Sequence, residues 1–193
     1  MRTEERTHRV EAVLNHRQPD LTVVIENVHD PHNVSAILRS CDAVGILEIQ
    51  LVYTEEDYPE IGKKSSASAS KWIERRKFNS IESCYAALRN EGYTILATRL
   101  DEKTKSLYEL DLTRKVALVL GNEHRGVSDE AADSADGLFK IPMFGFVESL
   151  NVSVACAVTL FETLRQRMHH PDWAVRKLPD ERYHQLLNDW LAK

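Results

Sequence analysis

The chain has little of what marks secreted, membrane-spanning or disordered proteins. Among its 193 residues there are only 3 cysteines, Cys41, Cys84 and Cys156. Because they are odd in number and far apart, they predict reduced thiols rather than a disulfide framework or a Cys-x-x-Cys metal site. No apolar run approaches the roughly 18 residues of a membrane span, and the polar segment Met1–Arg6 is unlike a secretory signal. These absences favour a cytoplasmic protein, and an apolar content of 42% excludes intrinsic disorder.

An excess of positive charge is also missing. The chain has 25 Lys and Arg residues against 30 Asp and Glu residues, a formal net charge of −5, which taken alone argues against a nucleic-acid binder. The stretch 62–78 differs from this total, because it has a single acid, Glu74, among its basic residues. These basic residues form a candidate nucleic-acid-binding surface and are Lys63, Lys64, Lys71, Arg75, Arg76 and Lys77. A solvated loop and strand with fortuitous charge is the alternative.

Apolar runs and turn residues predict strands that alternate with helices. The clearest strand is Val116–Leu120, an apolar run that leads into a glycine. Other strands are expected at Leu21–Ile25, Ile46–Tyr53, Tyr93–Thr98 and Leu138–Ile141. Cap residues predict helices that run from Asn33 to Gly45, from Asn79 or Ser80 to Gly92, from Ser128 over a short stretch, and from about Leu150 to Met168. This alternation is typical of an α/β fold with a mostly parallel sheet between helices.

Two helical extensions are expected to flank a single core. The segment Arg6–Arg17 has apolar residues at helical spacing, and Pro19 follows its end. The segment Pro179–Lys193 has the same pattern, after a break at Pro171. We therefore divide the chain into an N-terminal extension 1–20, a core 21–168 and a C-terminal extension 169–193.

The first segment that is unusual for plain scaffold runs from Asn27 to Ser40. It follows a buried strand, so it lies at the carboxyl edge of the predicted sheet, where open α/β sheets bind ligands. Asn33 is either a helix cap or a functional amide, and Arg39 is either a solvated helix charge or a functional cation. His29 and His32 lack a third ligand at a known spacing, so no metal site is expected.

The second segment, Gly121–Ser128, directly follows the clearest strand. It imitates the phosphate loop G-x-x-x-x-G-K-[ST], but Val127 stands where lysine is required, which excludes binding of a nucleoside triphosphate through that motif. The chain also lacks the G-x-G-x-x-G of a dinucleotide-binding fold. The glycines of the segment still let backbone amides approach a ligand closely. A tight strand-to-helix turn is the alternative.

The third segment, Ile141–Ala155, contains in order a strand end, a proline, a glycine loop and a polar helix start. Ser149 is the expected N-cap of that helix. Asn151 is expected inside the first turn of an otherwise apolar helix. A buried amide there needs hydrogen-bond partners, which a ligand can supply.

Together the three segments resemble the SPOUT class of RNA methyltransferases and, within it, the TrmH family of ribose 2′-O-methyltransferases. The resemblance covers about residues 21–167. It rests on three motifs in the family's order, N-x-x-x-x-x-R from Asn33, G-N-E-x-x-G from Gly121, and I-P-M-x-G-x-x-x-S-L-N-V-S-V-A from Ile141. It implies S-adenosylmethionine as methyl donor, a ribose 2′-hydroxyl as acceptor, a homodimer and a deep C-terminal trefoil knot. Threading of this kind is essentially absent from folds in general, so no chain pattern predicts it.

The resemblance also implies roles for individual residues. Contacts to the methyl donor, largely through backbone groups, fall on Thr98, Gly121, Ile141, Met143 and Leu150. The positions that match the family's functional residues are Asn33, Arg39, Glu123, Ser149 and Asn151.

The implied reaction displaces a methyl group from a sulfonium, so the protein must align the hydroxyl, remove its proton and exclude water. In the family, the arginine that Arg39 matches is proposed as the general base, aided by a substrate phosphate. Taking a proton from a guanidinium at neutral pH costs on the order of 7 kcal/mol. Holding the phosphate and the hydroxyl in place is the less costly role for Arg39.

The short extensions favour guanosine 18 in the tRNA D-loop as the target, since family members with that activity have them. Methylation of rRNA is the first alternative, although rRNA relatives usually carry a separate N-terminal RNA-binding domain. A non-catalytic RNA-binding protein of the same fold is the second, and the intact Arg39, Glu123 and Asn151 argue against it. A small-molecule substrate is disfavoured by the basic stretch. Arginines near the N-terminus are expected to widen the RNA-binding surface, namely Arg2, Arg6, Arg9 and Arg17.

Overall fold

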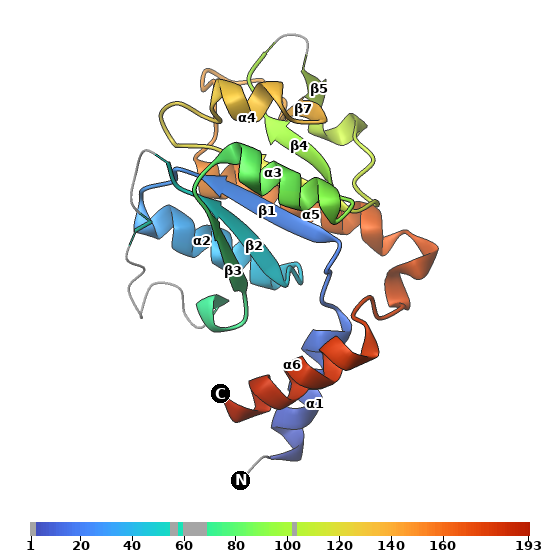
Figure 1. Cartoon of the computed structure of the whole chain (residues 1–193). Coiled ribbons are helices and arrows are strands. Elements are labelled where there is room, and N and C mark those ends of the chain that lie inside the picture. The colour runs from blue at the N-terminus through green and yellow to red at the C-terminus, as the bar shows by residue number, and fades with distance from the viewer. Residues whose placement is uncertain (1–2, 55–57, 60–68, 102–103) are drawn as a thin grey trace.

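The computed structural model of the chain describes residues 3–54, 58–59, 69–101 and 104–193. Within these residues, seven strands form one sheet in the order β3-β2-β1-β6-β4-β7-β5 (Figure 1). The strands are β1 Leu21–Glu26, β2 Glu48–Val52, β3 Glu74–Phe78, β4 Thr94–Thr98, β5 Lys105–Ser106, β6 Val116–Leu120 and β7 Gly137–Lys140. Every strand pair is parallel. The predicted α/β fold with a mostly parallel sheet between helices is therefore confirmed.

Helices cover both faces of the sheet (Figure 1). The helices α2 Pro31–Ala43 and α5 Val152–Met168 pack together on one face, and α3 Ile81–Asn90 and α4 Asp129–Asp133 lie on the other. The remaining helices, α1 Glu4–Asn15 and α6 Asp180–Ala192, lie beyond the amino ends of the strands. Short 3-10 turns occupy Ala69–Lys71, Leu107–Glu109 and Pro171–Ala174.

The central strands are buried on both faces. Every residue of β1 and of β6 is buried. Successive side chains of a strand point to opposite faces, so Val23 and Ile25 pack with α2 and α5, whereas Val24 packs with α3. Strands buried in this way appear in a sequence as continuous apolar runs, which is why their positions were predictable.

The two terminal helices pack against each other rather than extending as separate arms (Figure 1). Their interface buries Leu14 of α1 together with Leu186 and Trp190 of α6. Leu47, just before β2, lies in the same cluster and joins it to the sheet. The extensions thus share a small apolar core of their own.

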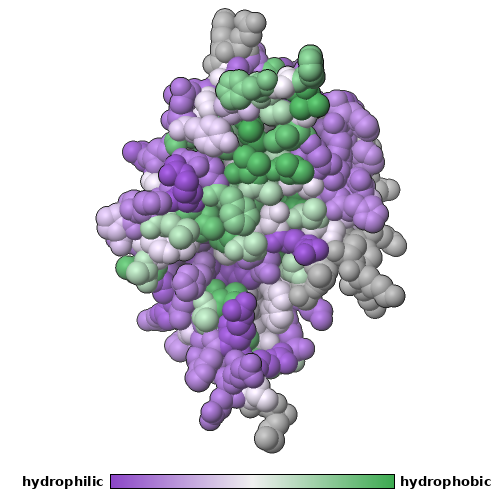
Figure 2. Space-filling view, turned by 180° about the vertical axis from the view of Figure 1, so that it is seen from behind, coloured by the Kyte–Doolittle hydropathy of each residue, from purple (hydrophilic) through white to green (hydrophobic). Residues whose placement is uncertain are grey.

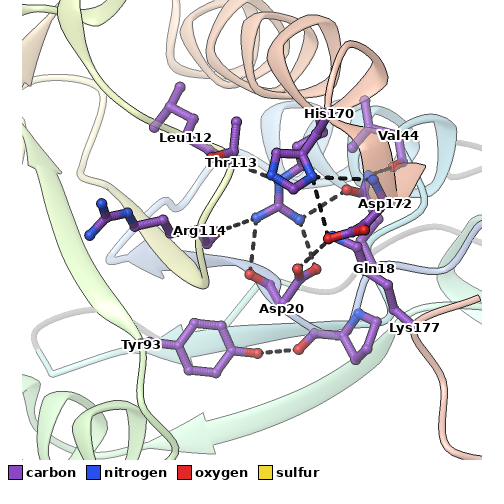
Figure 3. Close-up of polar contacts among 12 residues, drawn as sticks. Gln18, Asp20, Val44, Tyr93, Leu112, Thr113, Arg114, His170, Asp172 and Lys177 are labelled. Atoms are coloured by element: carbon purple, nitrogen blue, oxygen red, sulfur yellow. Dashed lines mark hydrogen bonds and ion pairs between the residues drawn. The ribbon is translucent and has the colours of Figure 1, made fainter. Parts of the chain in front are cut away.

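A buried arginine joins the end of α5 to the segments that precede β1 and β6, and Figure 3 shows its partners Gln18, Asp20, Leu112 and Arg114. Arg167, at the end of α5, is only 1% exposed. Its Nε donates to the Leu112 carbonyl at 3.0 Å, and its Nη1 donates to Gln18 Oε1 at 2.9 Å and to Asp20 Oδ1 at 2.7 Å. Its Nη2 donates to the carbonyls of Asp20 and Arg114. A guanidinium has five N–H donors, so all the donors of Arg167 are satisfied within the protein.

Arg17 is also buried, which corrects the expectation that it widens an RNA-binding surface. It is 1% exposed, donates to the Ile46 carbonyl at 2.6 Å and forms an ion pair with Asp42. Its guanidinium lies 5.0 Å from the ring centroid of Trp190. Burial lowers the pKa of Arg17, and the neighbouring Asp42 acts in the opposite direction. The residue thus links the segment after α1 to Asp42 of α2 and to Trp190 of α6 instead of facing solvent.

Two helix starts differ from expectation. The N-cap of α2 is Asp30, whose carboxylate accepts from the His32 N–H at 2.8 Å, and Asn33 lies inside the first turn. The N-cap of α5 is Asn151, whose Oδ1 accepts from the N–H of Ser153 at 2.9 Å, and not Ser149. Asp and Asn are strong N-caps, and proline is favoured at the first helical position, where Pro31 stands. The sequence placed the helices correctly but assigned the caps to the wrong residues.

The three cysteines are free and buried. Burial raises the pKa of the Cys84 thiol to about 12, so at neutral pH it remains a thiol. No described helix is long and apolar enough to cross a membrane.

Candidate functional site

A pocket of about 400 Å³ opens at the carboxyl edge of the sheet. Its walls are the segments that follow β4, β6 and β7, together with the start of α5. This size is within the range of small-molecule sites, and open α/β sheets bind ligands at this edge. The predicted site residues that line it are Thr98, Gly121, Glu123, Ile141, Met143, Ser149 and Leu150.

The segment after β6 is a tight backbone loop. The N–H of Asn122 donates to the Gly126 carbonyl at 2.9 Å, and the N–H of Gly126 returns a bond to the Asn122 carbonyl at 2.8 Å. A Cβ on Gly121 would lie 2.1 Å from backbone atoms of Gly126, a separation that real atoms do not tolerate. Gly126 itself has φ +69°. Only glycine fits at position 121, because the loop folds back directly over it.

The same loop is tied to the end of β1, the neighbouring strand. The side-chain amide of Asn122 donates to the carbonyl of Asn27 at 2.8 Å. The N–H of Ser128 donates to the carboxylate of Glu26 at 2.9 Å. Asn27 has φ +49°, a left-handed conformation that asparagine tolerates better than most residues. The pocket wall is therefore braced from outside by the first unusual segment.

A chain of side-chain contacts crosses from α5 to the loop after β6. The Asn151 amide donates to Asn33 Oδ1 at 3.0 Å, and the Asn33 amide donates to Glu123 Oε1 at 2.9 Å. The second oxygen of Glu123 lies 3.2 Å from His29 Nδ1. Three residues from separate motifs thus meet in one network, which helix capping alone does not require.

The remaining predicted donor-site residues contribute mainly backbone and apolar surface. The Thr98 hydroxyl donates to the Val119 carbonyl at 3.1 Å, so this hydroxyl is used within the sheet. Ile141, Met143 and Leu150 supply apolar walls to the pocket.

Arg39 does not line this pocket. It is exposed on α2 and borders a shallow hollow of about 320 Å³. His32, Ser35, Ala36 and Ser40 line the hollow with it. Of the five predicted functional residues, Glu123 and Ser149 line the pocket, and Asn33 and Asn151 are joined to Glu123 by hydrogen bonds. Arg39 has neither connection among the contacts described above.

The basic stretch is only partly described. Lys63 and Lys64 lie outside the described residues. Arg75 and Lys77 are exposed on β3, an edge strand of the sheet, and Lys71 is exposed just before it. Arg76 donates to the Glu91 carboxylate at 2.6 Å, and this hydrogen bond raises the pKa of Arg76.

Charged residues that the motifs did not single out also border the pocket. Arg99 follows β4 and forms an ion pair with Asp129 at 2.9 Å, and Lys140 donates to the carbonyl of Asp101 at 2.7 Å. The rule that ligands bind at the carboxyl ends of strands would have placed Arg99 and Lys140 here. His29 was considered only as a metal ligand, and its contact with Glu123 had no sequence signal.

Comparison with known proteins agrees with this geometry. The sequence profile of the SpoU rRNA methylase family matches residues 20–161. The tRNA (guanosine(18)-2′-O)-methyltransferase of Thermus thermophilus is 47% identical over 192 residues, covering 100% of this chain and 98% of that protein. The chain therefore belongs to the SpoU rRNA methylase family, which confirms the resemblance drawn from the three segments.

Two solved structures are similar over the core and beyond. The crystal structure of the A. aeolicus TrmH/SpoU tRNA modifying enzyme has a TM-score of 0.91 at 36% identity, covering 98% of this chain and 96% of that chain. The SpoU methyltransferase AviRb from Streptomyces viridochromogenes, in complex with the cofactor AdoMet, has a TM-score of 0.66 at 26% identity. That match covers 80% of this chain and 63% of AviRb. The A. aeolicus match includes the terminal helices as well as the core, since it spans nearly the whole chain.

Proposed function

We propose that this protein methylates the 2′-hydroxyl of a ribose in tRNA, at guanosine 18 of the D-loop, with S-adenosylmethionine as methyl donor. The observation that carries the proposal is the single pocket in which all five predicted donor residues meet Glu123 and Ser149. Nearly full-length similarity to tRNA (guanosine(18)-2′-O)-methyltransferases supports the choice of substrate.

The pocket suits a methyl donor that contains an adenosine. Apolar walls from Leu120, Ile141 and Leu150 suit a base ring, while polar groups of the loop after β6 suit ribose and amino-acid atoms. The folded-back loop at Gly121 holds backbone groups against the pocket and leaves them little freedom to move. When bound, the donor supplies an electrophilic methyl group activated by the positive charge on sulfur.

The protein's own residues then align the acceptor hydroxyl with the methyl group. Glu123 and Ser149 border the pocket, and Asn33, which accepts a hydrogen bond from Asn151, donates one to Glu123. Arg39 holds the phosphate next to the target ribose, so that the hydroxyl faces the methyl group. When the RNA substrate covers the mouth of the pocket, water is excluded from the reacting groups.

This role requires Arg39 to reach a pocket that its own chain does not place beside it. A second copy of the chain solves this problem. Apolar side chains are exposed on α5 and on the loop before it, at Phe144 98%, Phe146 107%, Val147 62%, Val154 47% and Phe161 52%. Figure 2 shows that apolar residues gather on the face of the molecule opposite to the view of Figure 1. Exposed apolar surface of this kind marks a protein interface. Arg39 lies on α2, which packs beside α5, so a dimer through this face brings each Arg39 toward the partner's pocket.

Subunit mixing tests the dimer and the shared site together. Arg39→Ala and Glu123→Ala homodimers are each inactive, and they are unfolded, mixed and refolded to form heterodimers. If Arg39 acts on the partner's pocket, one site of each heterodimer is intact and the mixture regains about a quarter of the wild-type rate. No recovery, despite mixed dimers detected by mass spectrometry, would show that Arg39 acts within its own chain.

Mapping of 2′-O-methyl groups in total tRNA, with and without the protein, tests the activity and the target position. A new methyl group at guanosine 18 is expected, and it requires S-adenosylmethionine. Methylation of rRNA but not of tRNA would favour the rRNA alternative, which agrees with the description of the family as rRNA methylases. Binding of tRNA with no donor affinity in calorimetry would favour a non-catalytic RNA-binding protein.

A further inference from the structure

The histidine beside Glu123 has no assigned role in the network. Its Nδ1 lies 3.2 Å from Glu123 Oε2, and the side chains of the two residues are 42% and 13% exposed. Oε2 is shielded from solvent and accepts no hydrogen bond from the described residues, so the ion-pair contact with His29 is what faces it. His29 is therefore the side chain that faces the second oxygen of the nearly buried Glu123 carboxylate.

The contacts of the network run in one direction. A carboxylate oxygen accepts and does not donate, so Glu123 Oε1 is the acceptor for the Asn33 amide, while His29 Nδ1 lies within ion-pair distance of Glu123 Oε2. Because the Asn33 amide donates to Glu123, its own Oδ1 faces Asn151 and accepts from that amide. Asn151 Oδ1 is thereby left to cap α5. The orientation of each amide depends on where the Glu123 carboxylate points.

We propose that His29 is a positioning residue for methyl transfer: it holds the Glu123 carboxylate at the pocket and, through it, the orientation of Asn33 and Asn151. The inference rests on the proposed function of the pocket. Without His29, Glu123 is free to turn Oε2 toward water, and the Asn33 amide loses its fixed acceptor. Misplacement of a catalytic group by about 1 Å can cost about a hundredfold in rate.

The ring of His29 is itself held. It stacks on the ring of His124 with a centroid separation of 5.7 Å and an interplanar angle of 30°. A ring restrained on one face presents Nδ1 to Glu123 in a constant direction. Asparagine places an amide nitrogen where histidine has Nδ1, so His29→Asn is the conservative variant.

The experiment compares His29→Ala, His29→Asn and the control His184→Ala, which removes an exposed histidine from α6. His29→Ala is expected to lower kcat for tRNA methylation by about 10- to 100-fold, with an unchanged KM for tRNA and an unchanged thermal unfolding midpoint. His29→Asn is expected to recover most of the rate, and His184→Ala to match the wild type. A merely structural role would move the unfolding midpoint and would not be rescued by asparagine.

A double-mutant cycle tests whether His29 acts through Glu123. The probe is S-adenosylhomocysteine, the product left by the donor, and its affinity is measured by calorimetry for both single variants and the pair. If His29 acts through Glu123, adding His29→Ala to Glu123→Ala changes the affinity by less than about twofold. Independent, additive losses would overturn the inference.

Two further outcomes separate this inference from the proposed function. A wild-type rate in His29→Ala, with Glu123→Ala inactive, would overturn the role of His29 and leave the site assignment standing. A wild-type rate in Glu123→Ala would overturn the assignment of the site and this inference with it.

Discussion

A polar network lies at each end of the sheet, and the two networks differ in whether their groups face a pocket. At the amino ends of the strands, Arg167 is 1% exposed and gives every donor to a neighbour. At the carboxyl ends, Glu123 and its partners border a pocket of about 400 Å³. The first network is enclosed by protein, whereas the second has one side facing a pocket of a size that suits a small molecule.

The comparison shows how to distinguish a structural role from a functional role among residues of the same type. Buried polar groups that are fully paired stabilise one arrangement, because breaking any contact leaves an unsatisfied group. Polar groups that border a pocket are in a position to bond a ligand. Arg167 and Arg39 are the same residue type, but only Arg39 is exposed with a hollow beside it.

The largest expected effect is on stability, at the amino end. Arg167→Met removes the guanidinium and leaves Asp20 Oδ1 and several carbonyls without this donor, although Lys177 still pairs with Asp20 Oδ2. Because each buried acceptor left unsatisfied costs about 1–3 kcal/mol, the unfolding free energy should fall by about 3 kcal/mol. Urea denaturation measures it, and Arg39→Ala, which removes an exposed arginine from α2, is the control expected to match the wild type in stability. A loss below about 1 kcal/mol in Arg167→Met would show that the network does not hold the junction.

The next largest effect is expected on the rate of methyl transfer and not on stability. Arg39→Ala should reduce methyl transfer to below about a tenth of the wild-type rate, a loss of more than about 1.4 kcal/mol. Because Arg39 is exposed and lies outside the pocket, donor affinity and unfolding free energy should not change. Single-turnover kinetics with saturating tRNA make the measurement. A variant that keeps more than a tenth of the rate would remove Arg39 from the reaction.

The pocket wall should be sensitive at one glycine and tolerant at another. Gly121→Ala places a Cβ 2.1 Å from backbone atoms of Gly126, so the loop must move and donor binding should weaken by about tenfold or more. Gly145→Ala is the control, since a Cβ there meets nothing within 4 Å. Calorimetric titration with S-adenosylmethionine compares the two. Equal affinities would mean that the loop after β6 does not shape the donor site.

The smallest effect concerns neither network but the edge of the sheet. Replacing Lys71, Arg75 and Arg76 by alanine should weaken tRNA binding and reduce its logarithmic salt dependence by up to about three units. Donor affinity should stay constant, since none of these residues lines the pocket. A triple alanine variant at Arg89, Lys105 and Arg114 removes the same charge elsewhere and should keep the slope. An unchanged slope in the first variant would make this surface a solvated face, and would direct attention to the terminal helices.

Most of the fold and much of the site were predictable from local patterns. Buried strands such as Val116–Leu120 are continuous apolar runs, and glycines at positive φ, Gly45 and Gly92, end helices where expected. The three motifs located the pocket loops through resemblance to a family. The caps of α2 and α5 were misassigned because Asp30 and Asn151 compete locally with Asn33 and Ser149 for the same role. The knot that the resemblance implies stays a prediction, since strand order does not describe threading.

By itself, the sequence determined the alternation of strands and helices, the loops that carry polar groups, and the excess of acid over base. These properties depend on contacts within a few residues or on simple composition. Only the tertiary structure decided that Arg17 is buried, that Arg39 stands apart from the pocket, and that His29 faces Glu123. For His29 and Glu123 the physical reason is the strand order. Because β6 pairs with β1, the loops that follow these two strands lie together although they are far apart in the chain.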